Sequence, residues 1–294
     1  MWLSILSYQH ELYPALLRGL PDAPPILYAK GNLPLLKNKQ WVGMVGARNA
    51  SLNAIYLVKT WSQSLAEKGV GLVSGFARGI DKAMHDGALD QGSIGVFAGG
   101  LSHIYPAEHE NYISAFLENG VIIAENPPHV MPLQKLFPRR NRLIAGICSA
   151  LLIIEAARHS GALITAQYAI EYGREIGVVP GFSLDPRAYG GNELLKEGAQ
   201  MITQLEDIWS MLPQRDAEPM TDTRASLSPK IPQGADEEDV QKVLDALSAM
   251  PLSIDILIQS MPLDANRVNE ILSELEIKDK IMRISGNKVA LRLS

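Results

Sequence analysis

The chain of 294 residues is long enough for one large domain and a smaller one, and its composition, 47% hydrophobic and 20% charged, is typical of a soluble globular protein. Its formal net charge of −5 does not by itself suggest a nucleic-acid partner, and its single cysteine, Cys148, excludes an intrachain disulfide and favours a reduced, buried thiol. No stretch approaches the roughly 20 apolar residues of a membrane helix, and the start of the chain lacks the basic region of a signal peptide. We therefore expect a cytoplasmic protein that does not enter the membrane.

Short apolar runs alternate with helical patterns from Gln40 to Ile202. The runs have the length expected of strands buried on both faces, and the segments between them carry apolar residues at helical spacing. This alternation predicts an α/β fold: a Rossmann-like, doubly wound and mainly parallel sheet with helices on both faces. The predicted strands are WVGMV (41–45), GLVS (71–74), SIGVF (93–97), VIIA (121–124), ALLII (150–154), EIGVV (175–179) and QMI (200–202).

The turns that follow these strands are rich in Gly, Ser and Arg. Ligands of such sheets bind at the carboxyl ends of the strands, where glycine allows a close backbone approach and helix N-termini offer free N–H groups to phosphate oxygens. Arg48, Arg78 and Arg158 each lie in one of these turns. The sequence therefore predicts a rim of the sheet that can bind a polyanion.

The stretch FPRRNR, residues 137–142, gathers three arginines next to an aromatic residue. Residues 131–196 around it carry eight basic and five acidic side chains, so a basic region exists inside an acidic protein. A run of charged residues usually lies on a solvated face of a protein. This run, in contrast, comes shortly before a predicted buried strand. An aromatic ring beside guanidinium groups suits single-stranded nucleic acid, because the ring stacks on a base while the arginines hold phosphates.

The C-terminal part of the chain has a different pattern. Residues 211–235 contain four prolines and little aliphatic periodicity, and are predicted to be a flexible linker. Residues 236–294 show three helical patterns and two strands around a Gly-Asn turn, which predicts a small winged-helix domain. Its third helix, residues 264–280, carries five acidic and three basic residues, so duplex phosphates would repel it. We expect this domain to contact a protein or to be auxiliary.

Other chemistries fit the sequence less well. The first turn, GARNAS (46–51), lacks the G-x-G-x-x-G of dinucleotide sites, and no P-loop sequence occurs. The six histidines lack the spacing of metal ligands and are expected to be ordinary surface or turn residues. Glu125 and Glu155 follow strands and could act as acid and base, but an ion-pair role that holds the arginines is favoured. Asp81 is expected to be structural, at a helix N-terminus.

Together these motifs are similar to those of the DprA/Smf family of bacterial DNA processing proteins. The matching stretches run from about Val42 to Ala199 in the family's order: VGARNAS, SGFARGIDKAMHDGAL, GGLSHIYP, FPRRNRLIAG, EAARHSGALITA, GREIGVVPG and GGNELLKEGA. Residues 1–40 resemble the family's lead-in and are expected to pack on the core. The resemblance implies that the core, residues 41–210, binds and protects single-stranded DNA and loads the RecA recombinase onto it in natural transformation. It also implies a homodimer that works without nucleotide hydrolysis, and we expect no cofactor, metal or catalytic residue.

The resemblance also assigns residues to the DNA site. Motif by motif, it implies a role for Arg48, Ser74, Gly75, Arg78, Phe137, Arg140, Asn141, Arg142, Ser160 and Thr165. The stretch 137–142 would be a wall that grips phosphates and stacks a base, with Arg139, whose position varies in the family, facing solvent. Two turns depart from the family pattern: the usual aspartate of the GL-x-x-x-YP turn is missing, with Ser102 and His103 nearby, and Ala124 stands in place of a usual serine.

A nucleotide-processing enzyme of the phosphoribohydrolase kind is the alternative function. Such enzymes carry a P-G-G-x-G-T signature, and this chain instead has HSGALITA at residues 159–166, so DNA binding is preferred. For the homodimer, we expect an interface within residues 193–212, which are more apolar than a sheet edge needs. The competing role of that segment is to cover the last strand.

Overall fold

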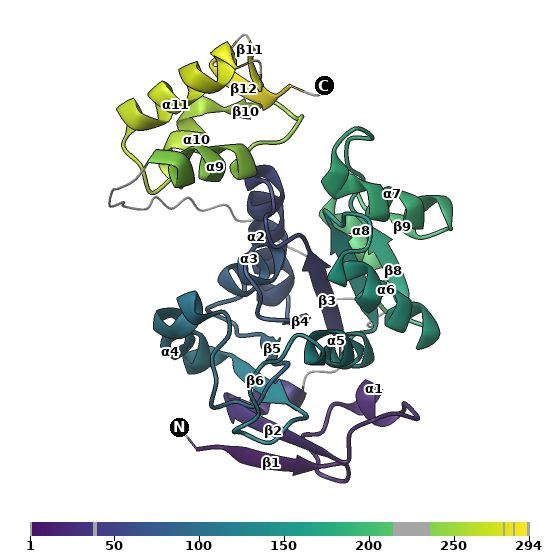
Figure 1. The fold of residues 1–294 in the computed structure, drawn as a ribbon. Helices are drawn as coiled ribbons and strands as arrows, with labels where there is room; N and C mark the ends of the chain where they lie inside the picture. Colours follow the sequence, from purple (N-terminus) through teal and green to yellow (C-terminus); the bar gives the residue numbers. More distant parts are fainter. Residues whose placement is uncertain (1, 38–39, 214–235, 279, 285, 293–294) are drawn as a thin grey trace.

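The protein folds into a large N-terminal part and a small C-terminal part, each with its own sheet (Figure 1). The computed structural model describes residues 2–37, 40–213, 236–278, 280–284 and 286–292. Most of the predicted linker, residues 211–235, therefore lies outside the described residues.

The larger sheet is doubly wound and mainly parallel. Its strands are β1 (Ser4–Ser7), β2 (Ile26–Gly31), β3 (Trp41–Gly46), β4 (Gly71–Ser74), β5 (Ile94–Val96), β6 (Val121–Ala124), β7 (Ala150–Ile154), β8 (Glu175–Val178) and β9 (Gln200–Met201). Their order is β1-β2-β6-β5-β4-β3-β7-β8-β9, and every pair from β6 to β9 is parallel. The parallel strands coincide with the predicted apolar runs, which confirms the predicted fold class. Residues 1–40 were expected only to pack on the core, but β1 and β2 extend its sheet by antiparallel pairing.

Helices cover both faces of this sheet (Figure 1). They are α1 (Ala15–Arg18), η1 (Leu33–Lys37), α2 (Leu52–Glu67), α3 (Ile80–Gly87), η2 (Ala107–His109), α4 (Glu110–Asn119), α5 (Leu136–Ile147), α6 (Gly161–Glu171), η3 (Pro186–Ala188), α7 (Tyr189–Lys196) and α8 (Leu205–Ser210). Successive side chains of a strand point to opposite faces. Accordingly, Leu151 and Ile153 of β7 pack in the cluster that contains α5 and α6, and Leu152 and Ile154 in the cluster that contains α2 and α3.

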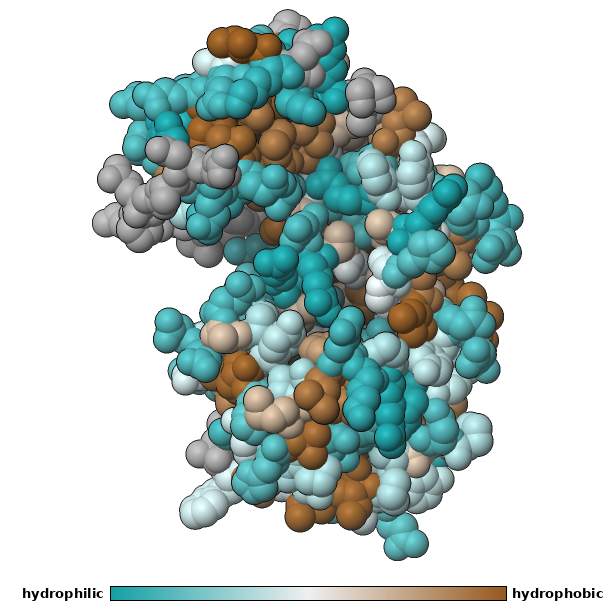
Figure 2. Space-filling view, in the orientation of Figure 1, coloured by the Kyte–Doolittle hydropathy of each residue, from teal (hydrophilic) through white to brown (hydrophobic). Residues whose placement is uncertain are grey.

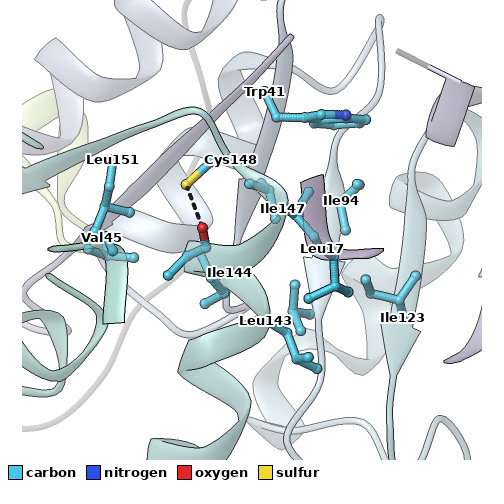
Figure 3. Packing of buried hydrophobic residues seen from close by; sticks show 14 of the residues in the cluster. Leu17, Trp41, Val45, Ile94, Ile123, Leu143, Ile144, Ile147, Cys148 and Leu151 are labelled. Atoms are coloured by element: carbon cyan, nitrogen blue, oxygen red, sulfur yellow. Dashed lines mark hydrogen bonds between the residues drawn. The ribbon is translucent and has the colours of Figure 1, made fainter. Parts of the chain in front are cut away.

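Cys148 lies in the first of these clusters, at the end of α5 (Figure 3). Its Sγ donates to the carbonyl oxygen of Ala145 at 3.7 Å, and burial raises the pKa of the thiol to about 12. The prediction of a buried thiol is confirmed, and at neutral pH this thiol stays protonated and unreactive.

The C-terminal part is a winged-helix domain, as predicted. Its elements are α9 (Asp236–Ala246), β10 (Leu252–Ser253), α10 (Ile254–Ser260), α11 (Ala265–Ile277), β11 (Ile281–Ile284) and β12 (Lys288–Leu291). The Asp264 side chain begins α11 by accepting a hydrogen bond from the backbone N–H of Arg267 at 2.9 Å. The sheet has the order β10-β12-β11, and buried residues such as Val268, Leu272 and Val289 give the domain its own core.

Two histidines are buried, although the sequence predicted surface or turn positions for all six. His85, on α3, and His109, at the end of η2, both contact the ring of Phe76, with centroid distances of 5.1 and 5.3 Å. The Nδ1 of His85 lies 2.8 Å from the Oγ of Ser93. Burial lowers the pKa of both imidazoles, that of His85 to about 3. The reason is tertiary: α3 and α4 close over these rings, a packing that histidine spacing along the chain does not show.

Acid is therefore expected to destabilise the folded protein through His85. Below the ordinary histidine pKa of about 6.5, the unfolded chain gains a proton that the folded protein takes up only near pH 3. Stability present at pH 7 is thus lost as the pH falls, by up to about 1.4 kcal/mol per pH unit for this group. Urea unfolding of the wild type and of His85→Phe between pH 4 and pH 6.5 checks this. The free energy of unfolding should change less steeply with pH in the variant, by the equivalent of about one bound proton. Equal slopes for the two proteins would contradict the assignment of this effect to His85.

Candidate nucleic-acid interface

A pocket opens where the carboxyl ends of β3, β4 and β7 meet. Its volume is about 240 Å³, and its wall comes from the loops after β3 and β4, the middle of α5 and the start of α6. The topology explains this position, because β3 and β7 are neighbours whose following connections leave in opposite directions. Five of the ten residues assigned to the site from the sequence line this pocket: Arg48, Arg140, Asn141, Ser160 and Thr165.

Arg48 presents an exposed cation at the edge of this pocket. It follows β3 directly, and its guanidinium lies 5.6 Å from the centroid of the Phe137 ring. The loop reaches this position because Gly46 lies against β7, where a Cβ would come within 1.9 Å of the carbonyl oxygen of Ile154. The guanidinium is thereby held where a phosphate could meet it.

The start of α6 supplies hydrogen-bond donors to the same pocket. Ser160 is the N-cap residue, but its side chain caps no backbone N–H, and its buried Oγ has no hydrogen-bond partner among the described residues. The first N–H groups of a helix lack intrahelical acceptors, and the helix dipole makes this end positive. A phosphate oxygen could accept from both kinds of donor. Thr165, in contrast, donates to the carbonyl oxygen of Gly161 at 3.2 Å, so it stabilises the first turn.

An aromatic pair lies beside the pocket. Phe137, in the first turn of α5, is half-buried and meets Tyr105 edge-on, with ring centroids 5.3 Å apart. The guanidinium of Arg140 lies 5.9 Å from the centroid of the Phe137 ring. Tyr105 was missed in the sequence, although its turn, GGLSHIYP, belongs to the matching motifs. Its proximity to Phe137, 32 positions further along the chain, appears only in the fold.

Arg140 is buried, which corrects the picture of a guanidinium group that faces the phosphates from the rim. Its guanidinium donates to the carbonyl oxygens of Gly75 and Val96, at the ends of β4 and β5. The carboxyl group of Asp81 lies on the same side of Gly75 as this guanidinium, and it accepts from the backbone N–H groups of Gly75 and Ala77 at 3.1 and 3.2 Å. Burial raises the pKa of Asp81, against the opposing charge of Arg140, and burial lowers the pKa of Arg140 to about 10. Asp81 is structural, as expected.

Arg142 is also buried, and it does not line the pocket. Its guanidinium donates to the carboxylate of Glu125 and, at 2.8 Å, to the carbonyl oxygen of Asp22. Arg139 is paired with the other oxygen of Glu125 at 3.1 Å, and its side chain is 63% exposed, in keeping with its expected orientation toward solvent. The geometry thus favours the ion-pair role of Glu125, and it engages Arg142 in buried contacts outside the pocket, contrary to the expectation that Arg142 faces DNA.

Asn141 and the assigned residues that follow β4 occupy different positions. Asn141 donates to the carbonyl oxygen of Gly161 at 3.1 Å and so connects α5 to the start of α6. Ser74 is fully buried and donates to the carbonyl oxygen of Met44 at 2.5 Å, so it cannot touch DNA in this fold, another correction. Gly75 lines a narrow cleft together with Phe137, and Arg78 is exposed in the loop before α3.

The carboxylates considered as catalytic groups are engaged elsewhere. Glu155 accepts hydrogen bonds from the backbone N–H and the Oγ of Ser51, at 2.8 and 2.5 Å, rather than from an arginine. Among the described residues, no group of three His, Cys, Asp or Glu side chains is placed to hold a metal ion. In the same part of the chain, no helix combines the length and the apolar character needed to cross a bilayer.

The apolar segment expected at a dimer interface is used largely inside the subunit. Ile202 and Ile208 are fully buried, and Leu194 and Leu195 pack against the core. Met201, on the edge strand β9, is 55% exposed. The competing role, covering the last strand, therefore takes most of this segment.

Two family models match the chain. The model described as DNA recombination-mediator protein A matches residues 4–213, and the model described as DprA winged helix domain matches residues 228–287. Among curated proteins, the chain is 37% identical to the DNA processing protein DprA of Bacillus subtilis over 218 residues, which cover 74% of this chain and 73% of that protein. It is 38% identical to Protein Smf of Escherichia coli over 207 residues, which cover 69% of this chain and 55% of Smf.

Two solved structures share the fold of the larger part. DprA from Streptococcus pneumoniae superposes with a TM-score of 0.68 and 35% identity, covering 72% of this chain and 75% of that one. DprA from Helicobacter pylori, described for its single-stranded DNA binding mode, superposes with a TM-score of 0.66 and 29% identity, covering 71% of this chain and 95% of that one.

Proposed function

Since this chain belongs to the family of DNA recombination-mediator protein A, whose members are named DprA or Smf, we propose that it binds single-stranded DNA at the carboxyl edge of its larger sheet. One observation carries the proposal: a single pocket combines the exposed guanidinium of Arg48 with the unsatisfied Oγ of Ser160 at the start of α6. The Helicobacter pylori relative, described for its single-stranded DNA binding mode, supports it.

In this proposal the pocket binds a phosphate and the aromatic pair binds a base. A phosphate in the pocket accepts hydrogen bonds from the α6 N-terminus and is paired with Arg48, and neither contact depends on base identity. The neighbouring base stacks on Phe137, which Tyr105 holds from the side. Arg140 and Asn141 contribute by fixing the loop ends around the phosphate.

Single strands are expected to bind more tightly than duplex, because Phe137 needs an unstacked base. Stacking of one base is worth about 1–3 kcal/mol, so the preference should be roughly tenfold or more. Titration of oligo-dT and of a duplex of the same length at two salt concentrations measures it. Equal affinities for the two at both concentrations would refute the proposal.

The finer parts of the function follow from the family. We propose that the protein protects the bound strand and loads the RecA recombinase onto it during natural transformation or recombination, in the cytoplasm and without a cofactor. The description of the matched family as a recombination mediator supports this role. The proposal includes no catalytic step, and it is supported by the engagement of Glu125 and Glu155 with arginines and with Ser51. No observation favours the phosphoribohydrolase alternative.

The protein is expected to be a homodimer in solution. Met201 is exposed on β9, whose outer edge lacks a strand partner among the described residues, and a second copy could cover both. Light scattering at tens of micromolar should give twice the chain mass of 32.1 kDa. Met201→Glu should lower that mass, whereas Met131→Glu, an equally exposed methionine far from this edge in the sequence, should not. A monomeric wild type would refute the proposed homodimer.

A further inference from the structure

Arg187, in η3, docks the winged-helix domain on the larger domain. Its guanidinium donates to the carbonyl oxygens of Leu247 and Asp245, at 2.7 and 3.2 Å, where α9 ends. Asp185 holds the same guanidinium from the other side, with N–O distances of 3.1 and 3.2 Å. A cation at a helix C-terminus satisfies the last carbonyl groups and meets the negative end of the dipole. Arg187 therefore connects the two domains.

The rest of this interface is loosely packed. Leu52, at the start of α2, reaches the core of the winged-helix domain. Next to it, a cavity of about 390 Å³ lies between the domains, with Trp61 on one side and Met250 on the other. Figure 2 shows the winged-helix domain as a separate lobe beyond the larger domain. This pocket is partly open to solvent, and the apolar side chains that line it forgo contacts with one another. We therefore expect docking to rely strongly on the hydrogen bonds of Arg187 and to be reversible.

The docked domain lies next to the proposed DNA pocket. The cavity between the domains is lined by Ser51 and Glu155, which are hydrogen-bonded to each other. The same two loops carry Arg48 and Ser160 into the DNA pocket on their other side. The cavity also reaches the residues that follow β8 and β9. A DNA strand that left the pocket along the rim in this direction would approach the winged-helix domain.

The charge of the domain opposes DNA. Residues 236–294 contain eleven acidic and seven basic side chains, a net charge of −4. Exposed carboxylates such as Glu238 and Glu270 are paired with Lys242 and Arg267, so the repulsion rests on the net charge of the domain and not on these two groups. The repulsion between such a domain and phosphates extends over about one Debye length. This length is about 30 Å at 0.01 M salt but only about 8 Å at 0.15 M.

We propose that the docked winged-helix domain restrains DNA binding as an acidic neighbour of the pocket, and that release of the Arg187 contact relieves this restraint. The inference rests on the proposed binding of single-stranded DNA. By linkage, bound DNA weakens docking by the same factor as docking weakens DNA binding.

The test uses the full chain with Arg187→Lys, which keeps the charge but loses the guanidinium fork. Hydrogen exchange without DNA should be faster in peptides that cover the start of α2 and the end of α9, and the radius of gyration from X-ray scattering should rise. Affinity for oligo-dT should increase roughly threefold at 0.01 M salt and stay unchanged at 0.15 M, as screening requires. The matched control is Arg283→Lys, whose exposed guanidinium pairs with Glu276 within the winged-helix domain. It should change neither property.

A second variant, Arg187→Ala, tests whether a change of charge by itself explains the change in DNA affinity. Loss of a positive charge alone would weaken DNA binding, so tighter binding by this variant as well supports the restraint. Faster exchange with unchanged or weaker binding at low salt overturns the restraint, and unchanged exchange in both variants overturns the role of Arg187 in docking. A wild type that does not bind oligo-dT refutes the proposed function itself, whereas normal wild-type binding without these effects refutes only this inference.

Discussion

Replacing Arg140 with alanine is expected to lower the free energy of unfolding by about 3–5 kcal/mol, the range for a buried charge that loses its partner. The buried guanidinium donates to the carbonyl oxygens of Gly75 and Val96. Without it, both carbonyl groups lose a donor inside the protein, and the buried carboxyl group of Asp81 loses a positive charge that stabilises its ionised form. Urea unfolding followed by circular dichroism at pH 7 measures the change.

The neighbouring arginine provides the matched control. The side chain of Arg139 is 63% exposed and pairs with Glu125 at the surface, so Arg139→Ala should cost less than about 1 kcal/mol. A loss of similar size in the two variants would show that Arg140 is no more important to folding than an exposed residue of the same run.

The loss of unfolding free energy caused by Arg140→Ala should become smaller as the pH falls from 7 to 5. Burial raises the pKa of Asp81 and Arg140 opposes that rise, so the folded-state pKa of Asp81 lies higher still in the variant. The unfolded carboxyl group has a pKa of about 3.9; the cost of the raised pKa is absent below that value and grows as the pH rises toward the folded pKa. Unfolding of both proteins at pH 5 and pH 7 gives the difference. A deficit independent of pH would assign the loss to the carbonyl groups alone.

Phe137→Ala is expected to weaken binding of oligo-dT by about 1–3 kcal/mol while leaving its salt dependence nearly unchanged. The substitution removes a stacking surface and no charge, and the ring is partly open beside the pocket. Arg48→Ala should behave differently. It removes one phosphate contact, so binding should weaken about equally for every sequence, and the log–log salt slope should fall by roughly 0.7. Fluorescence anisotropy titrations at several salt concentrations separate the two effects.

Matched controls lie outside the pocket. Tyr56→Ala removes an aromatic side chain that is 73% exposed on α2, and Arg283→Ala removes an exposed arginine of the winged-helix domain. At 0.15 M salt, where the charge of the winged-helix domain is screened, neither should weaken binding. If Phe137→Ala and Arg48→Ala keep the wild-type circular dichroism spectrum and bind like the wild type, the DNA site lies elsewhere on the molecule.

Much of the fold could be predicted because its strands are buried on both faces. A strand in that position must be apolar along its whole length. Such runs, bounded by glycine-rich turns, can be recognised in the sequence alone. The strands β1 and β2 were missed, because an edge strand with an exposed face, such as SILS of β1, carries no continuous apolar signal. The winged-helix domain was found through its helical periodicity and its Gly-Asn turn.

For the site, the sequence by itself determined which loops carry it: glycine, serine and arginine after parallel strands meet at one edge of the sheet in any doubly wound fold. Only the tertiary structure decided which arginines face a ligand. Arg140 and Arg142 lie in the same short run as Arg139, yet the first two turn inward, toward carbonyl groups at strand ends and the carboxylate of Glu125. Their acceptors lie on β4, β5 and β6, far from the run in the sequence. Whether a guanidinium stays in water depends on such acceptors, since burial of the charge is stable only where distant elements supply them.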